Sequence, residues 1–264
     1  MSFVKMLLCL LLLVPSQERF ELVGVIKGSY SRIHADNMGY LYVITKEQNL
    51  CKLSSAGDTL YTFEDKGFLV SHVDPSNPMK LLVYDNSQNT VKFLDKTLSP
   101  INSPILLDDL NIPATNVVSS SRDNLFWVFD DNVQELKKYN RNLKEVANSG
   151  SLTSITGKNI QPISLQESNA KVYVLDSLQG VFQFDHLGTY LFNFKKIKAK
   201  KIIAMGSKIV FLKDKELYLY DTVLLEEQKV ELKDSVSVLD FAISKNNIFI
   251  MTEQNVQVFR TVIN

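Results

Sequence analysis

The sequence predicts an all-β fold, a six-bladed β-propeller whose blades are four-stranded antiparallel sheets. A pair of apolar strands recurs about every 40 residues, and periods of this length are typical of propellers and other repeat architectures. The first strand of each pair is apolar on successive residues, as in strands that are covered on both faces. No segment of useful length shows helical periodicity, which argues against folds that alternate strands and helices.

Each repeat is interpreted as four strands separated by turns. In the first repeat we expect strands at residues 31–34, 40–44, 50–53 and 59–63. The second strand recurs at residues 81–84, 125–128, 172–175, 209–212 and 248–250. Asn, Asp and Gly lie between the strands, where they tolerate positive φ or bond their own backbone. A Gln-Asn or Gln-Gly pair recurs between strands two and three, and turn chemistry explains it without a binding role.

The last repeat predicts how the ring closes. It supplies strands at residues 239–243, 247–251 and 256–259, and then almost no sequence is left for a fourth strand. Residues 20–26 have the composition of a strand and can complete this blade from the other end of the sequence. Such a clasp removes an unpaired edge, which is an aggregation hazard in β-proteins.

The first 16 residues are predicted to be a secretory signal peptide. Lys5 supplies the positive start, residues 6–14 are an unbroken apolar run, and Pro15 and Ser16 end it. The run is about half the length that a spanning helix needs. We therefore expect residues 17–264 to form one propeller domain, exported to the periplasm or the extracellular space. It would not be an integral membrane protein after cleavage. An uncleaved anchor is the alternative.

The composition excludes some classes of function. Basic and acidic residues balance at 29 each, which argues against a nucleic-acid binder. The two cysteines are Cys9, inside the apolar run, and Cys51, which we expect to be a small buried hydrophobe. The mature chain would then have no internal disulfide, and we expect a monomer without a cofactor. A divalent cation such as calcium stays an open alternative.

Two turns carry a resemblance to known propellers. Residues 53–60 and 184–191 each contain a turn that ends in Gly-x-x-Leu, and residues 37–43 continue the pattern with Asn-Met-Gly before a strand. These segments resemble the repeat of the NHL-type and TolB-like six-bladed propellers, although the other four repeats lack that glycine. The resemblance implies a protein-binding platform or a peptide or glycan binder, and in some members a lactonase or lyase.

The candidate binding residues lie at one rim of the predicted ring. Aspartates end or follow several second strands: Asp85, Asp130, Asp131, Asp176 and Asp214. Carboxylates at a rim suit acid–base chemistry or calcium, and turn formation is the alternative reading. A lactonase-like site would need Glu, Asn and Asp from several blades to converge on the channel. The inner strands offer mostly Ser, Ile, Val and Ala, which weakens that hypothesis.

Other polar residues have simpler interpretations. His34 and His72 fall in equivalent first strands near the channel and could share a metal, whereas His186 lies in a turn and is expected to be solvated. The dense run at residues 195–201 includes Lys195, Lys196 and Lys198. It is either a solvated connector between blades four and five or a docking surface for an acidic partner. Trp127 is expected in the core.

Three hypotheses of function follow. The leading one is an exported, non-catalytic propeller that binds a protein or an extended ligand at the rim and channel mouth, since loops on a rigid scaffold commonly carry binding sites. The first alternative is a metal-assisted hydrolase or lactonase that uses the rim carboxylates. The second alternative is a structural component of an envelope complex.

Overall fold

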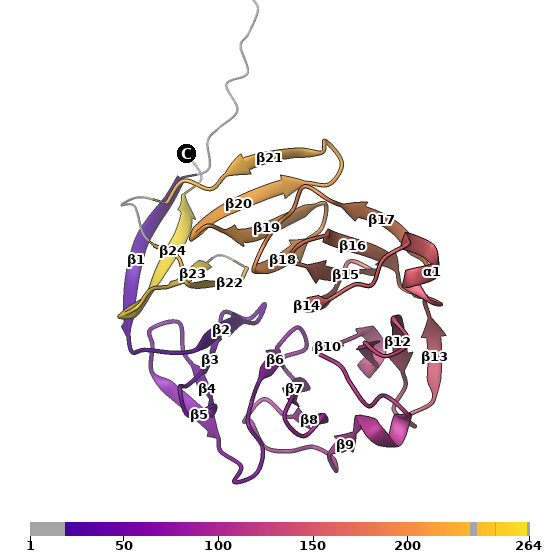
Figure 1. Ribbon diagram of the computed structural model, residues 1–264. Coiled ribbons are helices and arrows are strands. Elements are labelled where there is room, and N and C mark those ends of the chain that lie inside the picture. The colour runs from indigo at the N-terminus through magenta and orange to yellow at the C-terminus, as the bar shows by residue number, and fades with distance from the viewer. Residues whose placement is uncertain (1–18, 233–236, 246, 263–264) are drawn as a thin grey trace, which may run out of the picture.

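The computed structural model describes residues 19–232, 237–245 and 247–262. Within these residues, six four-stranded antiparallel sheets are arranged as blades around a central channel (Figure 1). The predicted six-bladed propeller is therefore confirmed. The predicted signal peptide at residues 1–16 lies outside the described residues.

The first three blades follow one another in the sequence, each beginning with its inner strand. Blade 1 consists of β2 (Arg32–Ala35), β3 (Leu41–Ile44), β4 (Leu50–Leu53) and β5 (Thr59–Phe63). Blade 2 consists of β6 (His72–Asp74), β7 (Leu81–Asp85), β8 (Thr90–Leu94) and the short β9 (Ile105–Leu106). Blade 3 consists of β10 (Val118–Ser120), β11 (Phe126–Asp130), β12 (Glu135–Tyr139) and β13 (Glu145–Asn148).

The other three blades complete the ring. Blade 4 consists of β14 (Pro162–Ser168), β15 (Lys171–Asp176), β16 (Gly180–Asp185) and β17 (Tyr190–Phe194). Blade 5 consists of β18 (Lys201–Met205), β19 (Lys208–Lys213), β20 (Glu216–Asp221) and β21 (Glu226–Lys229). Blade 6 consists of β22 (Asp240–Ile243), β23 (Asn247–Met251), β24 (Asn255–Val262) and, as its outer strand, β1 (Arg19–Lys27).

The predicted clasp closes the ring. β1 pairs antiparallel with β24, so that Phe20 lies opposite Thr261 and Ile26 opposite Val256. The two strands come from opposite ends of the described chain and lie side by side at the left of Figure 1. Ile26 is 4% exposed and packs between blades 6 and 1, whereas the neighbouring Val25 is 50% exposed. Pairing and burial therefore both hold the clasp in place.

The hydrophobic core lies between the blades. The described buried residues form six clusters, and each cluster joins two neighbouring blades. Along β7, Leu81 and Val83 face blade 1, while Leu82 and Tyr84 face blade 3. Successive residues of a second strand therefore enter different interfaces, which explains why these strands are apolar without alternation. Trp127 is fully buried between blades 3 and 4, as expected.

The connection between blades 3 and 4 contains the short helix α1 (Leu152–Thr156), which the sequence pattern did not predict. The Ser151 side chain accepts a hydrogen bond from the Ser154 N–H, and Gly157 ends the helix at a φ of 75°. Two 3-10 turns, Leu107–Leu110 and Arg122–Asn124, lie in blade connections and hairpins. No helix of the described residues is long and apolar enough to cross a membrane.

The ring has two rims, an upper and a lower one. The upper rim is the side on which the second strands β3, β7, β11, β15 and β19 end and the chain passes from blade to blade. The lower rim is the opposite side, on which the first and second strands of each blade are joined.

Candidate functional site

Two of the predicted rim aspartates are buried parts of the scaffold. Asp85 accepts the Ser87 N–H at Oδ1 and the Leu69 N–H at Oδ2, both at 2.8 Å. Asp176 repeats this arrangement in blade 4, where Oδ1 accepts the Leu178 N–H and Oδ2 accepts the Gln161 N–H, also at 2.8 Å. Each carboxylate therefore ties the end of the second strand to the segment that enters the same blade. The turn-forming interpretation is confirmed for both.

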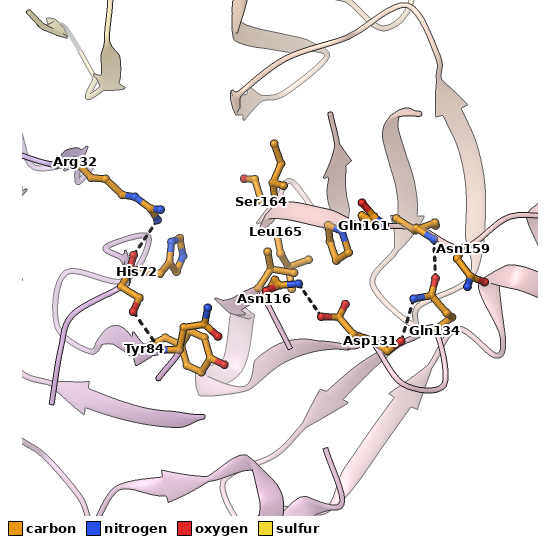
Figure 2. A pocket seen from close by; sticks show the side chains of 16 residues that line it. Arg32, His72, Tyr84, Asn116, Asp131, Gln134, Asn159, Gln161, Ser164 and Leu165 are labelled. Carbon is orange, nitrogen blue, oxygen red and sulfur yellow. Dashed lines mark hydrogen bonds between the residues drawn. The ribbon is translucent and has the colours of Figure 1, made fainter. Parts of the chain in front are cut away.

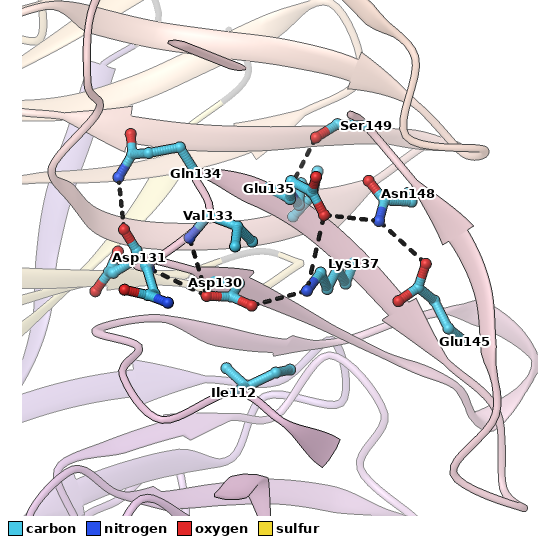
Figure 3. A network of polar contacts seen from close by, with 12 residues as sticks. Ile112, Asp130, Asp131, Val133, Gln134, Glu135, Lys137, Glu145, Asn148 and Ser149 are labelled. Atoms are coloured by element: carbon cyan, nitrogen blue, oxygen red, sulfur yellow. Dashed lines mark hydrogen bonds and ion pairs between the residues drawn. The ribbon is translucent and has the colours of Figure 1, made fainter. Parts of the chain in front are cut away.

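Asp130 is also part of the scaffold, but it forms an ion pair with a lysine. It is 1% exposed, and the Lys137 Nζ lies 2.8 Å from its Oδ2, while its Oδ1 accepts the Asn132 N–H at 3.1 Å. Lys137 in turn lies 3.7 Å from Glu135, which extends a polar network along blade 3 (Figure 3). The negative charge of Asp130 is therefore balanced within its own blade.

Asp214 and the predicted lysines lie apart from the other candidates. Asp214 is exposed at the tip of the β19–β20 hairpin, where it has a φ of 51° and Lys215 a φ of 64°. Lys195, Lys196 and Lys198 are exposed in the connector between β17 and β18, which Ile197 and Ala199 anchor in the core. The segment is an exposed connector, and neither of the two cavities described below includes any of these residues.

Asp131 has a different environment from the other rim aspartates. Its Oδ2 accepts a hydrogen bond from the Asn116 Nδ2 at 2.9 Å, whereas its Oδ1 is buried and has no hydrogen-bond partner among the described residues. Burial, together with the nearby Asp130 carboxylate, raises the pKa of Asp131 to about 6, against the lowering effect of the Asn116 backbone N–H. The two adjacent carboxylates therefore differ in their environment: Lys137 forms an ion pair with Asp130, whereas no described residue forms one with Asp131.

Asp131 lines a cavity of about 620 Å³ at the upper mouth of the channel, which we call the upper cavity. Segments of blades 1 to 4 form its wall, and Figure 2 shows the side chains that line it. Most of these are polar: Arg32, Ser71, His72, Tyr84, Asn86, Asn116, Asp131, Gln134, Asn159, Gln161 and Ser164. The sequence identified Asp131 as a candidate but missed this group, because its members come from strands and blade connections of four different repeats and share no motif.

Arg32 lies on the opposite side of the upper cavity from Asp131 (Figure 2). It is exposed, and one N–H of its guanidinium donates to the Ser71 carbonyl at 2.8 Å. The other polar groups are more constrained. The Gln134 side chain donates to the Asp131 carbonyl at 3.0 Å and accepts the Ile160 N–H at 2.6 Å. The walls of the cavity are therefore held in place by their own hydrogen bonds.

Tyr84 contributes a hydroxyl to the same cavity, but this group is already bonded. It donates toward the Asn89 Oδ1 and the Thr115 carbonyl, both at 3.0 Å. Burial, together with the charge of Asp131, raises the pKa of Tyr84 well above its ordinary value. The hydroxyl therefore stays protonated at neutral pH and is a poor base or nucleophile.

Below this lies the channel, a cavity of about 1440 Å³ that opens at the lower rim. His34 and His72 line it, and their ring centroids are 5.5 Å apart with the rings nearly perpendicular. The predicted position of both histidines at the channel is confirmed. Each Nε2 is buried without a partner among the described residues. His186, by contrast, is exposed in the turn after β16, as expected.

The two histidines are neutral at physiological pH. Burial lowers the pKa of His34 well below its ordinary value, and the cations of Lys201 and Arg32 contribute. Burial also lowers the pKa of His72 to about 4. In the part of the chain that the structure describes, no group of three or more His, Cys, Asp and Glu residues is placed to hold a metal ion.

Acidic side chains of the inner strands were missed by the sequence analysis, which expected mostly small and apolar residues there. Asp74 of blade 2 accepts the Ser120 N–H of blade 3 at 2.8 Å, and Asp240 of blade 6 accepts the Ile33 N–H of blade 1 at 2.8 Å. Glu167 of blade 4 accepts the Trp127 indole N–H of blade 3 at 2.6 Å. These carboxylates join neighbouring blades, and they occupy different positions of their strands, so the repeat period does not reveal them.

Comparison with known proteins shows the fold. No family model matches the chain, and no curated protein matches its sequence. Among solved structures, a streptogramin B lyase superposes with a TM-score of 0.61 at 10% identity, covering 93% of this chain and 98% of that one. A catalytically inactive histidine-to-alanine variant of virginiamycin B lyase from Staphylococcus aureus, with quinupristin, gives a TM-score of 0.62 at 10% identity, covering 93% of this chain and 100% of that one.

A third similar structure is BamB from Moraxella catarrhalis, with a TM-score of 0.48 at 11% identity. The match covers 84% of this chain and 70% of that chain. At 10% identity, the likeness to the two lyases supports the propeller fold and does not identify an activity. The resemblance to six-bladed propellers that the sequence indicated is confirmed at the level of the fold.

Proposed function

We propose that this chain is a non-catalytic binding propeller whose ligand site is the upper cavity. The observation that carries the proposal is the unpartnered, buried Oδ1 of Asp131 in a cavity lined by carboxamides and Arg32. A volume of about 620 Å³ falls within the range of small-molecule and peptide sites. The walls are fixed by internal hydrogen bonds, which is the preorganisation that a binding site needs.

The state of the other acidic groups favours binding over catalysis. Asp85, Asp130 and Asp176 use their carboxylate oxygens in the scaffold, and Asp74, Glu167 and Asp240 join blades. A hydrolase that works with two carboxylates requires both of them to reach the substrate. The upper cavity contributes a single carboxylate to its lining, that of Asp131.

One observation favours an enzyme as the second candidate. The pKa of Asp131 at about 6 is close to neutral pH, where a general acid or base is most effective. Such an enzyme would differ from a metal-assisted hydrolase or lactonase, because Asp131 alone would transfer the proton. The test is whether the protein hydrolyses a lactone or an ester. If Asp131→Asn abolishes this turnover but still binds the ligand, the enzymatic function is established over the binding function.

The test of the binding function is a thermal-shift screen of residues 17–264 against peptides, sugars, small acids and divalent metals. A ligand that binds only the folded state raises the free energy of unfolding, and with it the melting temperature, by an amount that grows with the logarithm of its concentration over Kd. We expect a shift that Asp131→Asn abolishes and Asp214→Asn, an exposed rim aspartate outside the cavity, leaves unchanged. A shift that survives Asp131→Asn would move the site away from the upper cavity.

We also propose that the protein acts outside the cytoplasm, in the periplasm or extracellular space, where it binds a protein or an extended ligand. The predicted signal peptide supports this location. Cell fractionation with detection of the mature N-terminus tests it. Membership of a larger envelope complex is a separate hypothesis, and stable co-purification with a membrane protein from envelope extracts would support it.

A further inference from the structure

The upper cavity contains a negative charge that lacks a counter-ion. With a pKa of about 6, Asp131 is mainly ionised at neutral pH, yet the described side chain that bonds it is the neutral amide of Asn116. Lys137, on the next strand β12, is bonded to Asp130. Leaving a buried charged acceptor without a donor is costly, so Asp131 favours a ligand that brings a cationic donor.

The opposite wall carries a positive charge with free donors. Arg32 uses one guanidinium nitrogen to bond the Ser71 carbonyl, and a guanidinium has five N–H groups in a planar fork. Its side chain is exposed at the cavity. Arginine binds carboxylates through two parallel hydrogen bonds, so this wall favours a ligand that brings a carboxylate.

The rest of the cavity lining is suited to amide groups. Side-chain amides of Asn86, Asn159 and Gln161 line the cavity together with the apolar Ile163, which is 47% exposed. Carboxamides both donate and accept, as a peptide bond does, and exposed apolar surface beside them can cover small side chains.

We propose that the upper cavity binds a zwitterion, an amino acid or short peptide with free ends, whose ammonium group meets Asp131 and whose carboxylate meets Arg32. This inference rests on the proposed binding function and specifies its ligand. A sugar could bond both groups through its hydroxyls but would supply no opposite charge to either. A dianion would be repelled by Asp131, and a dication by Arg32.

The test uses calorimetry at pH 7.5 on residues 17–264. The ligands are alanine and alanine peptides of two to four residues, together with a mixed tripeptide library monitored by ligand-detected NMR. We expect alanine or at least one of the alanine peptides to bind. N-acetylation of that ligand should weaken its binding tenfold or more, and so should C-amidation, because each removes a charge-assisted hydrogen bond.

The variants assign each end of the ligand. In Asp131→Asn, the free and the acetylated peptide should bind equally weakly, and in Arg32→Gln, the free and the amidated peptide should do so. Asp214→Asn and Arg122→Gln are the matched controls, because both residues are exposed and lie outside the upper cavity. Melting curves for all four variants exclude a loss of fold as the cause.

The outcomes separate this inference from the binding function on which it rests. Equal affinity for free and blocked peptides overturns the zwitterion assignment. Binding of a sugar or small acid that depends on Asp131, with no binding of any peptide, overturns it as well and leaves the binding function standing. A complete absence of ligands that respond to Asp131→Asn overturns both.

Discussion

Lys201 and Asp240 form an ion pair in which the Lys201 Nζ lies 2.7 Å from the Asp240 Oδ1. The same ammonium donates to the Ile33 carbonyl at 2.7 Å, and the other oxygen of Asp240 accepts the Ile33 N–H at 2.8 Å. The pair therefore connects the inner strands of blades 5, 6 and 1, at the channel edge of the blade whose outer strand is the clasp.

Replacing Lys201 with Met should destabilise the fold by roughly 3 kcal/mol, because it leaves the mostly buried Asp240 carboxylate without its cation. The free energy of unfolding, measured by urea titration, tests this. Lys200→Met is the control, since Lys200 is an exposed neighbour. Equal stability of the two variants would show that the pair contributes nothing to the closed ring.

The clasp makes a second prediction. Ile26→Ala should lower the free energy of unfolding by about 2–4 kcal/mol, because Ile26 is buried between blades 6 and 1 and its truncation leaves a cavity. Val25→Ala, on the exposed side of the same strand, should change it by less than about 0.5 kcal/mol. Similar losses in both variants would indicate that strand pairing alone holds β1 in place.

The channel histidines predict a loss of stability in acid. Their pKa values are lowered in the folded protein, so unfolding takes up protons once the pH falls below the ordinary histidine value of about 6.5. The stability that neutral His72 contributes is present above pH 6.5 and disappears as the pH falls towards about 4. His72→Asn should flatten this part of the pH dependence of urea unfolding.

Two other outcomes can be distinguished in the same experiment. Asp131 opposes the histidines, because its raised pKa makes the folded state more favourable as the pH falls from about 6 to about 4. The comparison is therefore made in the Asp131→Asn background as well. An identical pH slope with and without His72 would contradict the assignment of a lowered pKa to this residue.

Asp131 itself should reduce stability at alkaline pH. Since its folded pKa lies above the unfolded value, ionisation costs the folded state stability at all pH values above about 6. Asp131→Asn should then raise the free energy of unfolding at pH 8 by about 1 kcal/mol, after allowance for solvent screening, with a smaller gain at pH 4. Stabilisation combined with loss of ligand binding is the pattern expected of a functional residue. A loss of stability at pH 8 would instead assign Asp131 to the scaffold.

Most of the fold could be predicted from the sequence because the propeller repeats a local pattern. The consecutive apolar residues of β7 indicated a strand covered on both faces, and the structure places them in two different interfaces. The shortage of strands after Phe259 indicated the clasp. Helix α1 was missed because its five residues are too few to show helical periodicity.

The candidate site was predicted less well. Asp85, Asp130 and Asp131 look alike in the sequence, since each ends or follows a second strand. Their roles differ through contacts with other segments, the Leu69 N–H for Asp85 and the Lys137 ammonium for Asp130. Arg32, which faces Asp131, comes from a blade that is distant in the sequence. No spacing in a single sequence records such a pairing.

The pairing of β1 with β24 also determines the order in which the molecule can form. Arg19 lies opposite Val262, so the first described strand has no partner in its blade until nearly all of the chain is available. Contacts between residues so far apart are slow to form, because the entropy of a long loop is lost before the contact is made. Blades 1 to 5 are built from consecutive strands and can assemble locally, which makes sealing of the sixth blade the expected slow step of folding.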